Sequence, residues 1–109
     1  MDGLMAINEL NELSQKLSQG IKLMGRYGRE YAAAERKYKI ALAQEARRLR
    51  AEDMPVTLID KVVHGEVANE RFERDTAEIM WKTSQENVNA IKLQIRILDN
   101  QISREYGNV

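Results

Sequence analysis

The sequence offers few side chains that could carry out acid–base or metal chemistry. His64 is the single histidine, and the chain has no cysteine, which excludes thiolate nucleophiles, disulfides and cysteine-based zinc sites. His64 precedes Gly65 and has no second histidine at the spacing of a metal-binding helix motif. A histidine in this position is typical of a helix end, where the helix dipole favours a basic side chain. We therefore expect no metal site and no cofactor.

Carboxylates and glycines also fall short of known catalytic patterns. Three glutamates follow one another at helical spacing: Glu66, Glu70 and Glu73. They alternate with arginine and lysine, which is typical of a solvated, ion-paired helix face, and the Glu-x-x-His motif of diiron bundles is absent. No glycine belongs to a phosphate-binding loop with a Gly-Lys-Ser/Thr ending. We expect that the protein is not an enzyme.

Basic side chains gather in the first half of the chain. Nine lysines and arginines occur from Lys22 to Arg50, against three glutamates. Six of them form a candidate nucleic-acid surface: Arg36, Lys37, Lys39, Arg47, Arg48 and Arg50. Three tyrosines among them could stack on bases, namely Tyr27, Tyr31 and Tyr38. The tyrosines also lie on an apolar stripe, where core packing is the favoured role.

The charge pattern favours a chain that folds back on itself. Net charge is zero, and the stretch from Glu52 to Glu78 is mainly acidic. If the chain reverses near Pro55, the basic and acidic stretches lie side by side and neutralise each other. A chain of 109 residues with 43% hydrophobic residues and one proline predicts a single helical domain over residues 1–109.

A first long helix is expected over residues 4–52. Apolar or small residues recur at unbroken spacings of three and four: Leu10, Leu13, Leu17, Gly20, Met24, Tyr27, Tyr31, Ala34, Tyr38 and Ala41. This spacing predicts the packing stripe of a helix, and Pro55 ends the helix because it disfavours helical backbone at Met54. Gly20, Gly25 and Gly28 each weaken a helix by about 1 kcal/mol relative to alanine. Either the helix is broken near residues 20–28, or the glycines allow a close helix crossing.

A second long helix is expected over residues 66–106. Its seam alternates steps of four and three: Ala77, Trp81, Ser84, Val88, Ile91, Ile95, Leu98 and Ile102. A row beside the seam widens the apolar face: Ile79, Ala90, Leu93 and Ile97. A face this broad exceeds what one helix covers, so we expect a dimer or tetramer with a four-helix layer. The candidate oligomer interface is Trp81, Val88, Ile91, Leu93, Ile95, Ile97, Leu98 and Ile102.

The connector is expected to form a short helix over residues 56–64. Thr57 and Asp60 have the spacing of a capping box, and Gly65 suits a helix C-cap. A strand is the alternative, because valine and isoleucine favour strands. The fold class predicted is all-α: an antiparallel hairpin of two long helices with a short helical connector, assembling into an oligomeric bundle or coiled coil.

One part of the chain resembles small uncharacterised helical proteins of phages and prophages of Gram-positive bacteria. The segment from Arg48 to Ile59, RLRAEDMPVTLI, and the later Glu73-Arg74-Asp75 carry the resemblance, which covers about residues 30–100. Asp53 stands where the family has glycine, and His64 stands where it has arginine before a glycine. These departures affect the expected geometry of the turn between the helices. The resemblance implies a phage source and transfers no activity or binding residue.

The function predicted is a non-enzymatic oligomeric scaffold or protein-interaction module. Its partners would be further copies of the chain and an unknown host or phage protein, without a membrane. The alternative is an accessory nucleic-acid-binding protein in phage DNA replication or recombination, using the basic face of the first helix. The first residues lack a signal-peptide pattern, and no apolar run reaches the ~20 residues of a membrane span. We expect a cytoplasmic protein, in the host cell if it is phage-encoded.

Overall fold

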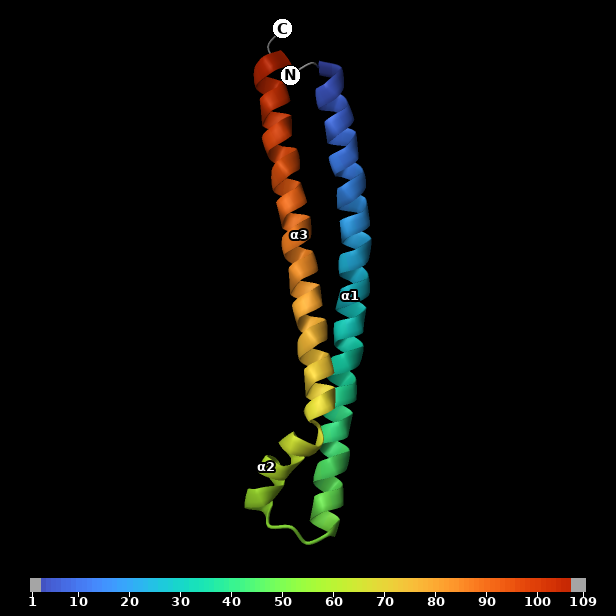
Figure 1. Ribbon diagram of the computed structural model, residues 1–109, viewed down its shortest axis with the longest axis vertical. Coiled ribbons are helices and arrows are strands. Elements are labelled where there is room, and N and C mark those ends of the chain that lie inside the picture. The colour runs from blue at the N-terminus through green and yellow to red at the C-terminus, as the bar shows by residue number, and fades with distance from the viewer. Residues whose placement is uncertain (1–2, 107–109) are drawn as a thin grey trace. The chain divides into compact units, whose positions relative to one another are not determined.

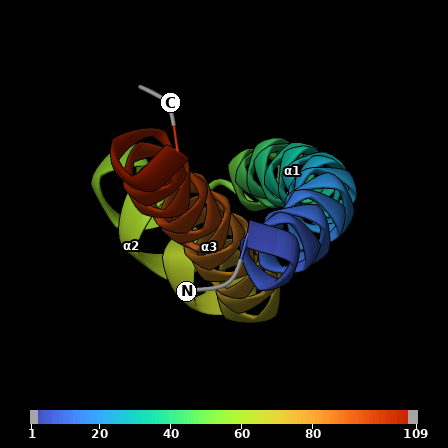
Figure 2. The same cartoon turned by 90° about the horizontal axis from the view of Figure 1, so that it is seen from above.

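The computed structural model describes residues 3–106, which form three α-helices and, within that range, no strand. Helix α1 spans Gly3–Ala51, α2 spans Val56–Glu66 and α3 spans Ala68–Tyr106 (Figure 1). The all-α hairpin is confirmed, since α1 and α3 lie side by side in both views (Figures 1 and 2). The predicted helices 4–52, 56–64 and 66–106 agree with these bounds to within two residues.

The hairpin divides into two compact units. We call Met1–Arg26 with Lys82–Val109 the terminal unit, and Tyr27–Trp81 the α2 unit. The predicted single domain, 1–109, includes end residues that lie outside the described range. Each unit contains part of α1 packed on part of α3, and the α2 unit adds α2. The two units therefore differ in how many helices surround their apolar residues.

Of the two alternatives for residues 20–28, the break does not occur, because α1 runs through this stretch as a continuous helix. A Cβ atom on Gly20 would lie 3.3 Å from Cγ2 of Val88 in the terminal unit. A Cβ on Gly28 would lie 3.1 Å from Nε1 of Trp81 in the α2 unit. The glycines are thus points where α3 side chains press against the α1 backbone, and this contact offsets their low helix propensity.

The predicted stripes face inward in both long helices. In α1, Leu13, Tyr38 and Leu49 are buried. The buried residues of α3 are Ser84, Val88, Ile91 and Leu98. Each fully buried valine or leucine contributes about 1.5–3 kcal/mol relative to an exposed one, so helix packing here comes mainly from the stripe.

A backbone motif around Asp53 ends α1. Met54 N–H donates to the Leu49 carbonyl (3.2 Å) and Asp53 N–H donates to the Arg50 carbonyl (3.0 Å), the pattern of a Schellman motif. Met54 also packs against the cluster that contains Leu49, the apolar contact that accompanies this motif. Asp53 has φ 61°, a conformation that favours glycine. The position where the resembled family has glycine is therefore the left-handed residue of the turn.

The connector forms a helix, α2, and not a strand, but both of its predicted caps are wrong. Pro55 is its N-cap and no side chain caps it, so Thr57 lies within the first turn and the predicted capping box is wrong. Gly65 lies inside α2, and the C-cap is Val67. The reason is packing: Val67 is 2% exposed, and carrying the helix past Gly65 buries it. Its N–H donates to the Val63 carbonyl (3.0 Å).

Helices α1 and α2 share the core of the α2 unit. The buried cluster contains Tyr38 and Leu49 from α1, Ile59 and Val63 from α2, and Val67 at the bend before α3. Half-buried side chains pack around it: Ala41, Leu42, Ala46, Met54 and Val62. From α3, the Arg74 guanidinium lies over the Tyr38 ring. Helix α2 therefore packs against the end of α1, and α3 reaches this core at Tyr38.

Candidate interaction surfaces

The predicted interface residues separate into buried and exposed groups. Val88, Ile91 and Leu98 are buried against α1, so the chain itself covers them. Trp81, Ile95 and Ile102 are half-buried. Leu93 and Ile97 are 52% and 56% exposed. Within the predicted set, the surface that remains for a second molecule is centred on Leu93 and Ile97.

A regular row surrounds these two residues on the outward face of α3. Its members recur at spacings of four and three, which places them on one side of a helix. We call them the α3 row: Glu86, Ala90, Leu93, Ile97, Asn100 and Arg104, all exposed. The row predicted from the sequence shares Ala90, Leu93 and Ile97 with it and missed Glu86, Asn100 and Arg104. Its fourth predicted member, Ile79, is 64% exposed and lies in the α2 unit. The spacing that would have identified the charged ends, Glu86 and Arg104, was present in the sequence.

An open groove lies beside this row in the terminal unit. Its α1 wall is Glu9, Glu12, Leu13 and Lys16, and its α3 wall is Gln94, Ile97, Leu98 and Gln101. A second hollow continues it past Gly20 and Leu23 of α1 and Ala90 of α3. The lining of the first groove mixes aliphatic side chains with charged and amide side chains.

Half of the predicted nucleic-acid residues are engaged in ion pairs within the chain. Lys37 Nζ lies 2.9 Å from Glu73 Oε2 of α3, and the hydrogen bond and charge of Glu73 raise the pKa of Lys37. Lys39 lies 3.7 Å from Glu35. The basic and acidic halves of the hairpin thus meet at the Lys37–Glu73 pair, as the charge pattern predicts.

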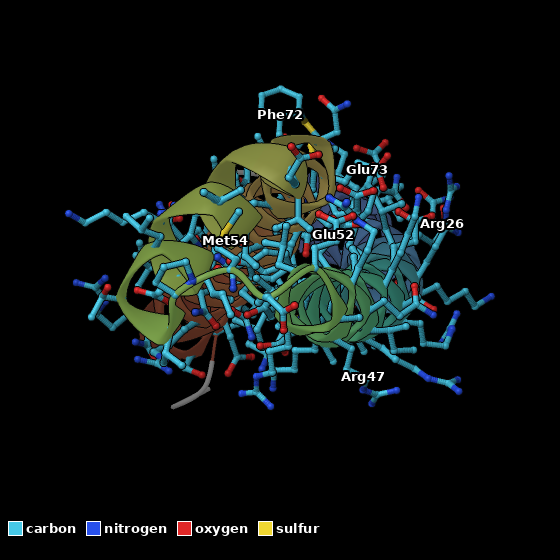
Figure 3. The ribbon with its side chains drawn as sticks, turned by 90° about the horizontal axis from the view of Figure 1, so that it is seen from below. Arg26, Arg47, Glu52, Met54, Phe72 and Glu73 are labelled. Carbon is cyan, nitrogen blue, oxygen red and sulfur yellow. The ribbon has the colours of Figure 1, made fainter. Side chains whose placement is uncertain are left out.

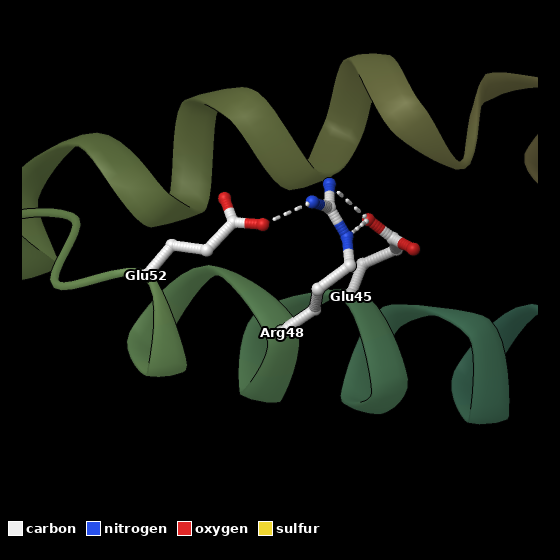
Figure 4. A network of polar contacts seen from close by, with 3 residues as sticks. All are labelled: Glu45, Arg48 and Glu52. Atoms are coloured by element: carbon white, nitrogen blue, oxygen red, sulfur yellow. Dashed lines mark hydrogen bonds and ion pairs between the residues drawn. The ribbon is translucent and has the colours of Figure 1, made fainter.

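Arg48 has two carboxylate partners on its own helix or at its end (Figure 4). Its Nε and Nη2 donate to Glu45 Oε2 at 3.1 and 2.9 Å, and its Nη1 donates to Glu52 Oε1 at 2.9 Å. These contacts, first those with Glu45, raise the pKa of Arg48. A guanidinium held in this way is poorly placed to bind a phosphate.

The other three basic residues remain on the outward face of α1. Within residues 3–106, Arg36, Arg47 and Arg50 are exposed and make no ion pair. Figure 3 shows Arg47 pointing away from α1. Between Arg36 and Arg47 the same face carries Ile40 and Ala43, so the cations border a small apolar patch.

Two of the tyrosines pack inside the α2 unit. Tyr38 is buried, and the Arg74 guanidinium lies 4.7 Å from its ring centroid. Tyr31 stacks on Trp81 with ring centroids 5.5 Å apart and an interplanar angle of 25°. Rings committed in this way do not present a free face to a base, which weakens the stacking argument for nucleic-acid binding.

The α2 unit has an apolar surface of its own. A hollow between α1 and α2 is lined by Leu42, Ala46, Val56 and Ile59, among others. Val56 is 76% exposed at the start of α2. Figure 3 shows Phe72 pointing outward from α3, where it is 71% exposed. Phe72 does not line the hollow that contains Val56, so these side chains form a less regular candidate surface than the α3 row.

His64 lies on the surface of α2 with its Nε2 3.5 Å from Asp60 Oδ1. No group of three metal-binding side chains occurs in the part of the chain that the structure describes. Over the same range, none of the helices combines the length and apolarity of a membrane span. No protein-family model, curated protein sequence or solved structure matches this chain.

Proposed function

We propose that this protein is a non-enzymatic, self-associating helical scaffold that serves as a protein-interaction module. The observation that carries the proposal is the exposure of Leu93 and Ile97 on α3, beside an open groove between α1 and α3. Two half-exposed aliphatic side chains one turn apart on a regular row are costly to leave in water and are typical of a helix-packing surface. The resemblance noted above supports a phage source and a site of action in the host cytoplasm.

The self-association is tested with the double variant Leu93→Lys/Ile97→Lys. Both side chains face outward, so the variant is expected to keep its helical circular dichroism and lose its oligomers. Sedimentation velocity from low to high micromolar concentration measures the change. Leu58→Lys, which replaces a similarly exposed leucine on α2, is the matched control and should associate like the wild type. A wild-type chain that stays monomeric throughout would overturn the proposal.

Nucleic-acid binding is the second candidate, and one observation favours it. Arg36, Arg47 and Arg50 are cations without an ion pair in residues 3–106, on one face of α1. Lysine and arginine on such a face bind phosphates through counterion release, which makes affinity fall steeply with salt. The ion pairs of Lys37, Lys39 and Arg48 reduce this surface to half of the set predicted from sequence.

Fluorescence anisotropy with labelled single- and double-stranded DNA tests this candidate at two salt concentrations. The triple variant Arg36→Glu/Arg47→Glu/Arg50→Glu should abolish a salt-dependent signal. The variant Lys22→Glu/Lys61→Glu/Lys92→Glu makes the same change in net charge at exposed positions elsewhere and should retain binding. Equal losses in both variants would mean that the signal is a nonspecific charge effect.

A further inference from the structure

We infer that the occupant of the α3 row is the same row of a second copy, running antiparallel around a two-fold axis midway between Leu93 and Ile97. This inference rests on the proposed self-association and specifies its geometry. The row lies within the terminal unit and is exposed along its length. Its members share helical spacing, and the size and charge of their side chains determine how two copies can pair.

The row is symmetric in its spacing and complementary in its side chains. Read from either end, the steps are four, three, four, three and four residues. When two copies are laid antiparallel with their centres matched, Leu93 of one copy faces Ile97 of the second copy. Ala90 then faces Asn100 of the second copy, and the small methyl group leaves room for the larger amide. The apolar pair occupies the centre and polar groups occupy the ends, as in protein interfaces generally.

Charge at the ends of the row selects the antiparallel arrangement. Glu86 of one copy faces Arg104 of the second copy, and the symmetry repeats this pair at the other end. A parallel pairing would instead place Glu86 against Glu86 and Arg104 against Arg104. Neither side chain has a partner within the described hairpin, so each is available for this contact. Like charges placed opposite each other suppress the parallel alternative.

The length of the row sets the expected strength. From Glu86 to Arg104 the helix rises about 27 Å, and a strip of that length along one helix is small beside a stable dimer interface. Association should therefore be reversible and depend on concentration. Because the pairing is isologous, it closes at two chains and does not extend into a filament.

Charge reversal tests the pairing. Glu86→Arg or Arg104→Glu alone places like charges opposite each other at both ends and should raise the dimer dissociation constant roughly tenfold. The double variant Glu86→Arg/Arg104→Glu restores both pairs and should restore the wild-type constant. Sedimentation equilibrium at low salt measures all four proteins. A dimer that is insensitive to the single reversals would overturn the pairing and leave the proposed self-association intact.

Cysteine cross-linking tests the direction, and the natural chain contributes no cysteine of its own. In the antiparallel register Ala90→Cys faces Asn100→Cys of the second copy, whereas two copies of either variant hold their thiols about 15 Å apart along the axis. A short bis-maleimide should therefore join a mixture of the two variants and join neither variant alone. Efficient linking of Ala90→Cys to itself would show a parallel dimer and overturn the inference. A chain that remains monomeric in every arm would overturn both the pairing and the proposed function.

Discussion

The two units of the hairpin bury their apolar side chains with different sets of helices. The α2 unit contains α2 with parts of α1 and α3, and the terminal unit contains parts of α1 and α3 alone. In the α2 unit, the cluster around Tyr38 and Leu49 packs α1 against α2, and Arg74 of α3 lies over the Tyr38 ring. In the terminal unit only α1 and α3 are present, and the buried apolar side chains form a single seam that includes Leu13 and Val88. Two helices cannot enclose a core, because each seam residue has neighbours on one side only.

This difference accounts for the position of the exposed apolar side chains around Leu93 and Ile97. One end of the hairpin is closed by an element of the same chain, whereas the other end offers the α3 row and the adjoining groove to a partner. Closure in the α2 unit is incomplete, since Phe72 and Val56 remain exposed. Phe72 does not line the hollow that contains Val56, whereas Leu93 and Ile97 belong to one row at helical spacing.

The largest expected effect is on the core of the α2 unit. Leu49→Ala removes a side chain that is 2% exposed and packed in the cluster shared by α1 and α2, which should lower the free energy of unfolding by about 2–5 kcal/mol. Leu13→Ala, in the two-helix seam, should cost less, because the open side allows water and neighbouring side chains to fill the space. Urea unfolding followed by circular dichroism at one fixed protein concentration compares them. Equal costs would remove the distinction between the units.

The next effect concerns the turn that brings α2 onto this core. Asp53 has φ 61°, where a residue with a Cβ is strained by about 1 kcal/mol relative to glycine. Asp53→Gly should therefore raise the free energy of unfolding by up to about that amount, less the entropy that glycine gains in the unfolded chain. Asp53→Ala should lower it. The same urea titration measures the free energy of unfolding of both variants. A higher value for Asp53→Ala than for the wild type would contradict the strain argument.

Much of this fold was accessible from the sequence because its long helices obey a strict period. The stripe through Leu13 and Tyr38 and the seam through Val88 and Leu98 predicted which faces are buried. The ends of α2 were not accessible, because Thr57 and Gly65 match capping rules that packing of Val67 overrides. Local rules describe an isolated helix, and a short buried helix follows its tertiary contacts instead.

The candidate surfaces were predicted in part for the same reason. Helical spacing already separates Leu93 and Ile97 from Val88, since the two sets lie on nearly opposite faces of one helix. Only the structure shows that α1 covers the face with Val88 and leaves the other face exposed. Composition identified the basic stretch, but only the structure distinguishes Arg47 from Arg48, which two glutamates hold. The sequence pattern does not show which basic side chains form ion pairs within the hairpin, because this depends on their rotamers and on their neighbours in the fold.

A smaller effect on stability is expected when glycine is replaced by alanine in a helix. Its size depends on whether the new Cβ atom would contact another side chain. A Cβ on Gly65 meets nothing within 4 Å, so Gly65→Ala should raise stability by about 0.5–1 kcal/mol through helix propensity. Gly28→Ala gains the same propensity, but its Cβ meets Trp81, whose ring is held by the stack on Tyr31. It should therefore gain less or lose stability. Thermal unfolding ranks the two variants, and an equal gain would mean that Trp81 moves freely.

The smallest effect concerns the Lys37–Glu73 ion pair that joins α1 to α3 in the α2 unit. Both side chains are exposed, so Lys37→Met should lower stability only slightly and mainly at low salt. The pKa of Lys37 is raised above its ordinary 10.5 in the folded state, so its contribution is complete at neutral pH and is lost as the pH rises through that raised pKa. The difference between wild type and Lys37→Met should therefore shrink in strongly alkaline buffer. Lys61→Met, at an exposed position on α2 without an ion pair in the described chain, is the control and should show no such dependence. If both variants respond equally to pH and salt, the cross-helix pair contributes nothing specific and the α2 unit is held by its apolar cluster alone.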